Sequence, residues 1–119
     1  MADQIALTET TYYILLSLYE PLHGYGIMQR TAELSGGRIQ LAAGTLYGAL
    51  NAMVDKGWIA LLPGEGRKKD YRLTPLGLEV LRKELARLRE LVASGDLVMK
   101  EDNSHGAEDR EKMGLGMGL

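Results

Sequence analysis

The sequence predicts a mainly α-helical chain that carries one small β-hairpin and ends in a long helix. Apolar residues recur at helical spacing in several stretches, and a Pro-Gly turn separates two short runs typical of strands. Thr74 followed by Pro75 is a strong start signal for the last helix. The chain has 119 residues, of which 45% are hydrophobic and 25% are charged, and this composition favours a folded globular protein.

The first two helices are expected at Thr8 to Tyr19 and at Gly24 to Leu34. Thr8 is a good N-cap, and Pro21 prevents the first helix from continuing. The first helix is apolar on nearly every side, which indicates burial on more than one face and favours contact with a partner chain. The alternation of polar and apolar residues over Arg38 to Leu41 predicts a short strand after the second helix.

The third helix is expected from Ala43 to Lys56, with Gly57 as its C-cap. Two strands, Trp58 to Leu62 and Asp70 to Leu73, flank the Pro63-Gly64 turn and predict a β-hairpin. The tip of this hairpin carries three consecutive basic residues, Arg67, Lys68 and Lys69.

The last helix has an apolar seam with alternating spacings of three and four residues, formed by Leu78, Leu81, Leu85, Leu88 and Val92. Such a seam either completes the core of the chain or pairs two chains, and we favour pairing. The pattern decays after Gly95, and the end of the chain is polar and then glycine-rich. We therefore predict a first domain at residues 1–74, a dimerisation helix at residues 75–100 and a disordered tail at residues 101–119.

Several classes of protein are disfavoured by composition. The chain has no cysteine and only two histidines, so we expect neither a thiolate nor a histidine metal site. It has no phosphate-binding glycine loop and no histidine-carboxylate cluster, so we expect no enzyme and no cofactor. No signal peptide and no apolar run of roughly 20 residues is present, and we expect a cytoplasmic protein.

The order of helices, hairpin and final helix is that of a winged helix-turn-helix, in which the third helix enters the DNA major groove and the hairpin lies on the backbone. Small residues at the start of the third helix, Ala43 and Gly44 among them, would let it approach base edges. The stretch from Gly37 to Leu73 holds six basic residues against three acidic ones, which suits a phosphate backbone.

Four segments, in order and at matching spacing, resemble the signatures of PadR-like transcriptional regulators. They are Leu22-His23-Gly24-Tyr25-Gly26-Ile27, Gly44-Thr45-Leu46-Tyr47, Gly57-Trp58-Ile59 and Arg67-Lys68-Lys69-Asp70-Tyr71-Arg72-Leu73-Thr74. The resemblance implies a dimeric winged-helix repressor with a single C-terminal dimerisation helix, and many members of the family release DNA when a small molecule binds. One departure is Asp70, where an aromatic residue commonly precedes the tyrosine.

The residues expected to contact double-stranded DNA at a palindromic operator are Tyr25, Ala43, Thr45, Tyr47, Arg67, Lys68 and Lys69, with the tyrosine, threonine and basic positions implied by the resemblance. The expected dimer interface comprises Leu7, Leu15, Leu81, Leu85, Leu88 and Val92. The resemblance also implies a pocket for a small effector between the two chains, near the first and last helices. We expect Tyr12, Tyr13 and Trp58 to line it and to suit a small aromatic molecule.

Each of these interpretations has an alternative. The basic tip could be a solvated hairpin end, the tyrosines could be half-buried core residues, and Trp58 could belong to the core. At the level of function, the alternative is a winged-helix adaptor that binds a protein and has no specific affinity for DNA.

Overall fold

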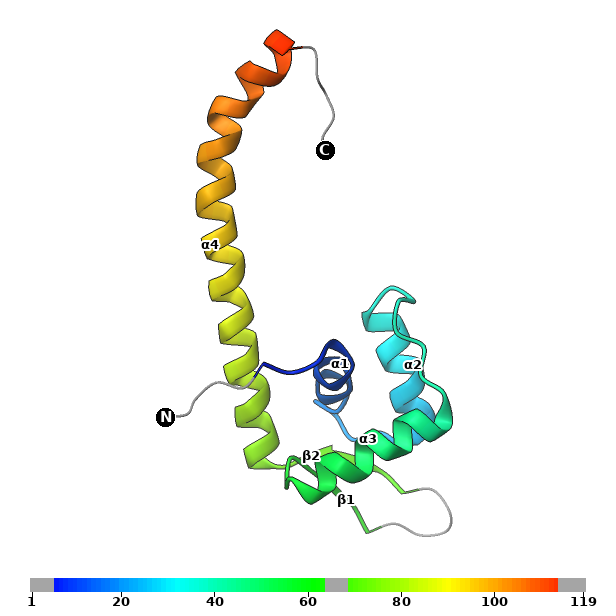
Figure 1. Ribbon diagram of the computed structural model, residues 1–119. Helices are drawn as coiled ribbons and strands as arrows, with labels where there is room; N and C mark the ends of the chain where they lie inside the picture. Colours follow the sequence, from blue (N-terminus) through cyan, green and yellow to red (C-terminus); the bar gives the residue numbers. More distant parts are fainter. Residues whose placement is uncertain (1–5, 64–68, 114–119) are drawn as a thin grey trace. The chain divides into compact units, whose positions relative to one another are not determined.

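The computed structural model describes residues 6–63 and 69–113, with side chains described as far as residue 100. In chain order the elements are α1 (Glu9–Ser17), α2 (Gly24–Leu34), α3 (Ala43–Asp55), β1 (Ile59–Leu61), β2 (Tyr71–Leu73) and α4 (Pro75–Met113) (Figure 1). They form two compact units, residues 1–85 and residues 86–119. The first turns of α4 therefore belong to the unit that contains the helices and the hairpin.

Helices α1 and α2 match the sequence expectation closely. Thr8 caps α1, because its side chain accepts a hydrogen bond of 3.1 Å from the backbone N–H of Thr11. The helix ends at Ser17, ahead of the predicted end at Tyr19. Helix α2 has the predicted bounds, and His23 occupies its N-cap without a side-chain capping bond.

The strand expected over Arg38 to Leu41 is absent, so that prediction is wrong. Gly36 and Gly37 have positive φ angles of 64° and 86°, and they turn the chain sharply after α2. The backbone N–H of Ile39 then donates to the Ser35 hydroxyl at 2.9 Å, so local bonds replace a strand ladder.

Leu22 supplies the sheet contact that this segment was expected to make. It forms an isolated antiparallel bridge with Tyr71, in which Leu22 N–H donates at 3.2 Å and Tyr71 N–H donates at 2.9 Å. The bridge ties the entry to α2 to the hairpin. The alternation of polar and apolar residues could not predict that Leu22 pairs with the hairpin and that Arg38 to Leu41 does not. A single bridge involves one residue and therefore leaves no repeating pattern in the sequence.

Strands β1 and β2 form the predicted hairpin, with Ile59 opposite Leu73 and Leu61 opposite Tyr71. Strand β1 is one residue shorter than expected at each end, and β2 begins one residue later than expected and ends at Leu73 as predicted. Two predicted tip residues, Arg67 and Lys68, lie outside the described residues. Lys69 is described and exposed.

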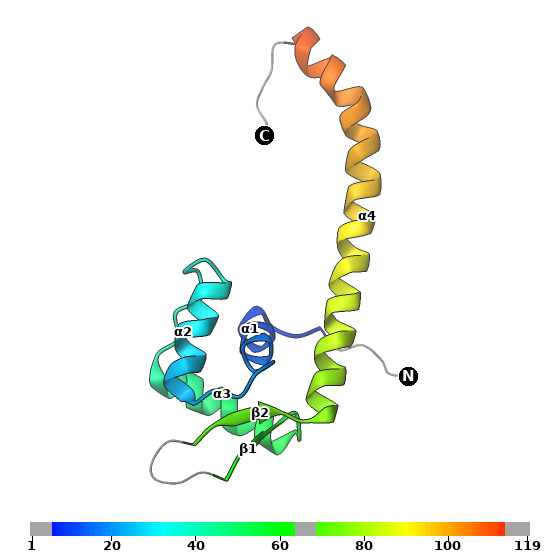
Figure 2. The same ribbon diagram turned by 180° about the vertical axis from the view of Figure 1, so that it is seen from behind.

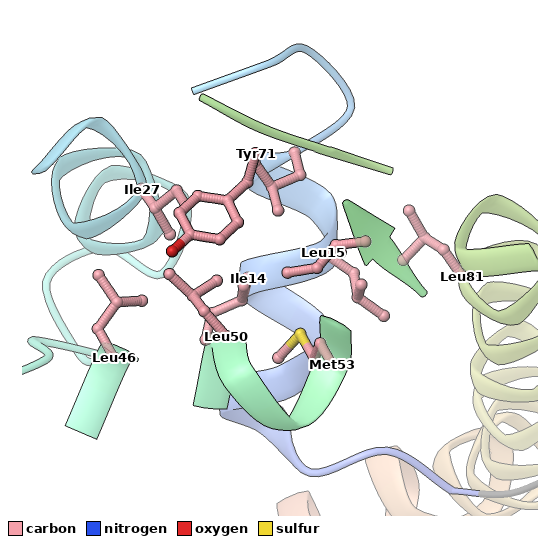
Figure 3. Close-up of a cluster of buried hydrophobic side chains, with 10 residues drawn as sticks. Ile14, Leu15, Ile27, Leu46, Leu50, Met53, Tyr71 and Leu81 are labelled. Atoms are coloured by element: carbon pink, nitrogen blue, oxygen red, sulfur yellow. The ribbon is translucent and has the colours of Figure 1, made fainter. Parts of the chain in front are cut away.

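The core of the first unit is built around α1, which lies between α2 and the first turns of α4 in both views of the chain (Figures 1 and 2). Figure 3 shows apolar side chains from every element of this unit converging there. The buried set is Ile14, Leu15, Leu18, Ile27, Leu46, Leu50, Met53, Ile59, Tyr71 and Leu81.

Two residues assigned to the dimer interface by sequence belong to this core instead. Leu15 is 0% exposed and Leu81 is 5% exposed, and both pack within the chain itself. A side chain that is buried in its own chain has no surface left to cover with a partner. The apolar seam of α4 therefore serves two purposes. Leu81 completes the core of the chain, and only the later positions remain available to a partner chain.

Helix α4 begins at Pro75, as predicted, and continues to Met113 rather than ending near residue 100. The apolar seam fades before that point, but the end of the helix, residues 107–113, is rich in the helix-favouring residues Ala, Glu, Arg, Lys and Met. The glycine-rich end, residues 114–119, lies outside the described part of the chain.

The first turn of α4 sits directly against the backbone that precedes β1. A Cβ atom at Gly77 would clash with the carbonyl group of Trp58, so glycine alone fits there. At Gly48, by contrast, a Cβ atom would meet nothing within 4 Å. These two helical glycines therefore differ in whether the fold needs them.

We expect Gly77→Ala to destabilise the protein by about 1–3 kcal/mol, because a backbone contact cannot yield as a flexible side chain can. The matched control, Gly48→Ala, should stabilise it by about 0.5–1 kcal/mol through helix propensity. Urea unfolding at one fixed protein concentration measures both values. An unchanged midpoint for Gly77→Ala would contradict the close contact at Trp58.

Candidate nucleic-acid interface

Helix α3 has an inner face that is buried and an outer face that is almost free of bulky side chains. Leu46, Leu50 and Met53 fix the inner face in the core. The residues exposed at the start of the helix are Ala43, Gly44, Thr45, Tyr47 and Gly48. No side chain caps the N-terminus of α3, so its first N–H groups are open to an external acceptor.

Two glycines make this outer face smaller than the fold requires. Gly44 and Gly48 are four residues apart and therefore lie on one side of the helix. A Cβ atom at either position would meet nothing within 4 Å, and neither glycine has a positive φ angle. Packing within the chain therefore requires glycine at neither position, and alanine would favour the helix more strongly at both.

Tyr47 lies against the beginning of α2. A Cβ atom at Gly24 would overlap the Tyr47 hydroxyl, so the glycine makes room for the tyrosine. The Tyr47 side chain nevertheless remains 45% exposed. Its ring therefore packs between the two helices while part of it stays accessible, which combines both roles considered for this residue from sequence.

A cavity of about 350 Å³ opens where α2, α3 and the hairpin meet, and it is lined by His23, Gly24, Tyr25, Tyr47, Leu61, Lys69 and Tyr71. It brings together three of the residues predicted to bind DNA, namely Tyr25, Tyr47 and Lys69. Tyr25 is 62% exposed, and its ring lies 6.5 Å from the ring of His23, centroid to centroid.

The inner wall of this cavity is Tyr71 of β2, which is buried. Burial raises the pKa of the Tyr71 phenol, and the neighbouring Tyr47 raises it further. A tyrosine phenol is protonated at physiological pH even without this shift, so Tyr71 can donate a hydrogen bond. It lines the cavity together with the phenol of Tyr47 and the ammonium group of Lys69. Phenols and ammonium groups donate hydrogen bonds to phosphate oxygens, and the described lining residues include no carboxylate.

The remaining predicted contacts are placed differently. Ala43 and Thr45 are exposed at the first turn of α3 and are not part of the cavity lining. Asn51, which is not among the predicted contacts, is exposed one helical turn after Tyr47, and that spacing could have drawn attention to it. The proximity of Gly24 to the Tyr47 hydroxyl was also not predicted, because this contact joins two different helices.

The residues proposed for an effector pocket lie on α1 and just before β1. Tyr12 and Tyr13 contact each other edge to face, with ring centroids 5.7 Å apart. Trp58 is half-buried, and the Lys56 ammonium group lies 4.7 Å from the centroid of its ring. None of the three lines the cavity described above, and their role as an effector site stays a prediction.

Within residues 6–63 and 69–100, no three His, Cys, Asp or Glu side chains gather as a metal site would require. The described helices include none with the length and apolar character of a membrane span.

Three helices, a hairpin beside the third, and a small exposed face on that third helix define the winged helix-turn-helix class of DNA-binding domains. The chain matches the model of the Transcriptional regulator PadR-like family over residues 14–83, which is more than half of its length. The chain therefore belongs to the PadR-like family, and it is a DNA-binding transcriptional regulator rather than an enzyme.

Individual relatives agree with this assignment. A PadR family transcriptional regulator from Eggerthella lenta is 28% identical, with a TM-score of 0.61 over 75% of this chain and 80% of the other. A PadR family regulator from Clostridium difficile has a TM-score of 0.64 over 77% and 99% of the two chains, and at 23% identity it supports the fold alone.

A curated relative is an uncharacterised 37.1 kDa protein in a transposon of Streptomyces fradiae, which is 42% identical over 64 residues. The match spans 54% of this chain but only 18% of that protein.

Proposed function

We propose that the protein is a homodimeric repressor that reads a palindromic operator, with α3 in the major groove and the hairpin on the phosphate backbone. The observation that carries the proposal is the pairing of two features: an outer α3 face that is smaller than the fold requires, and an adjoining cavity with hydrogen-bond donors. The first feature suits close approach to base pairs, and the second suits phosphate.

The major groove of B-DNA is about 12 Å wide and admits one helix, provided that its side chains are not bulky. Gly44 and Gly48 supply that clearance. Thr45 and Asn51 then have hydroxyl and amide groups that can pair with base edges, while the methyl group of Ala43 can contact a thymine methyl group. We assign sequence reading to these three side chains.

We assign backbone contacts to Tyr25, Tyr47 and Lys69, which the cavity brings together from α2, α3 and the hairpin. Contacts to phosphate fix the register of a protein on the duplex without reading its sequence. Arg67 and Lys68, which precede Lys69 in the sequence and lie outside the described residues, are proposed to extend the same contact.

The dimer part of the proposal rests on α4. Its later apolar side chains are exposed, including Leu91 at 55% and Val92 at 61%. We propose that a second copy covers these side chains together with Leu85 and Leu88, which are half-buried on the same helix. We propose separately that it covers Leu7, which packs beside the core of the first unit. A twofold dimer presents two α3 helices and therefore favours an operator with inverted half-sites.

We further propose that a small aromatic effector releases the repressor, as the family resemblance implies, and that Tyr12, Tyr13 and Trp58 contribute to its site. The half-buried Trp58 offers an aromatic surface on which a flat molecule could stack. Adding small aromatic compounds to the preformed DNA complex tests this part. If no compound lowers the fluorescence anisotropy of labelled DNA, the effector proposal fails while DNA binding stands.

DNA binding itself is tested by fluorescence anisotropy with DNA from upstream of the gene and with a scrambled duplex, at two salt concentrations. We expect Lys69→Ala to weaken binding to both duplexes and to reduce the salt slope by about 1, the effect of one lost phosphate contact.

The matched control is Lys83→Ala on α4, where the exposed lysine pairs with Glu79 at 3.3 Å. This variant should leave affinity and salt slope unchanged. An unaltered slope in Lys69→Ala would remove Lys69 from the interface. Absence of binding by the unmodified protein even at low salt would favour the adaptor function.

Gly48→Ala separates stability from DNA binding. The variant should be more stable than the unmodified protein, yet its affinity for the preferred DNA should fall by about tenfold or more, because a methyl group in a close-packed contact costs about 1–3 kcal/mol. The stability of the free protein is the internal control, since it must rise while affinity falls. Full affinity in this variant would place the outer face of α3 away from DNA.

A further inference from the structure

A single hydroxyl group connects the end of α3 to the beginning of α4. The Thr74 Oγ1 atom lies 2.6 Å from the carbonyl oxygen of Gly57 and 3.1 Å from that of Trp58. A hydroxyl group has one hydrogen to donate, so the shorter contact with Gly57 is the principal bond. The same oxygen atom accepts a hydrogen bond of 3.0 Å from the backbone N–H of Gly77.

The Gly57 carbonyl is fixed relative to α3. Gly57 has a φ angle of 80°, its N–H donates to Val54 at 2.9 Å, and the Trp58 N–H donates to Met53 at 3.0 Å. These two bonds form a Schellman motif, which closes the helix end rigidly. The acceptor of the Thr74 hydroxyl is thus part of the α3 terminus.

The other side of the contact is equally fixed relative to α4. Thr74 caps the helix through the Gly77 N–H, and its carbonyl accepts the Leu78 N–H at 2.9 Å. The Thr74 N–H donates to Trp58 at 3.0 Å, and Gly77 has no room for a side chain against the Trp58 carbonyl. Pro75 adds a restricted φ angle at the first helical position.

We propose that the Thr74 hydroxyl determines which half-site spacing the dimer accepts, an inference that rests on the proposed function. We call the contacts of Thr74 with the Gly57 and Trp58 carbonyls the α3–α4 joint. In a dimer paired through α4, the two α3 helices are connected through this joint in each copy. Each added base pair rotates one half-site by about 35° and moves it by about 3.4 Å. With a stiff joint, the dimer cannot follow that change and its affinity for the altered operator falls. With a flexible joint, both α3 helices can still reach their half-sites and the affinity falls less.

Three substitutions separate the two roles of the hydroxyl. Thr74→Ser keeps both the capping acceptor and the donor to Gly57. Thr74→Asp keeps an acceptor for the Gly77 N–H, but its carboxylate cannot donate to the Gly57 carbonyl. Thr74→Val is nearly isosteric and loses both bonds. A capping role alone would make the aspartate variant behave like the unmodified protein.

The experiment begins with an operator selected by the unmodified full-length protein from random-sequence DNA. Dissociation constants are then measured on that operator, on versions with one or two base pairs added or removed between the half-sites, and on a duplex with a single half-site. Affinity for the single half-site measures DNA contact by α3 and the hairpin. The change in affinity across the operators of different spacing measures the stiffness of the α3–α4 joint. Circular dichroism confirms that each variant is folded.

We expect one added base pair to cost the unmodified protein and Thr74→Ser at least about tenfold in affinity, and to cost Thr74→Asp about threefold or less. Single half-site affinity should stay within about twofold in all three proteins. Thr74→Val should show the same tolerance of spacing, and Thr74→Asn, whose side-chain oxygen also accepts from the Gly77 N–H, replaces the aspartate variant if that variant is unfolded.

A spacing profile of Thr74→Asp that coincides with the unmodified profile would overturn the inference. An equal loss on every duplex, single half-site included, would also overturn it, because that result signifies general destabilisation. The proposed function fails separately, if the unmodified protein selects no sequence with paired half-sites.

Discussion

Burial of α1 is the constraint on which the first unit depends. Ile14, Leu15 and Leu18 are almost completely enclosed, and α2, α3, the hairpin and the start of α4 each contribute apolar side chains around them. Because apolar burial is the dominant favourable term in folding, this arrangement fixes which face of every surrounding element points inward. The outer face of α3 is then exposed as a consequence, not as a separate feature.

Glycine is used for opposite purposes at different places in this unit. Gly77 is required by the backbone carbonyl of Trp58, whereas Gly24 leaves room for the Tyr47 hydroxyl, which lies at the end of a side chain that could move. Gly44 and Gly48 have no such neighbours, and they lower helix propensity without any benefit to packing within the chain. The contrast separates a position that the fold requires from positions for which we propose close approach of DNA.

The α3–α4 joint links the two proposed activities of the protein. Helix α3 is proposed to contact DNA and α4 to contact a second copy, and the Thr74 hydroxyl bonds to the terminus of the first while capping the second. These bonds restrict movement of the end of α3 relative to the start of α4. The nearby half-buried Trp58, whose carbonyl takes part in the joint, lies next to the same connection.

Local patterns in the sequence determined the helices and the hairpin, because N-caps, Pro75, Gly57 and apolar periodicity act within a few residues of one another. They also indicated the family through four short segments. Only the tertiary structure decided that Leu15 and Leu81 complete the core, that Leu22 bridges to Tyr71, and that the Tyr47 hydroxyl lies against Gly24. Those outcomes depend on contacts between residues far apart in the chain, and periodicity in one segment carries no information about which other segment will cover it.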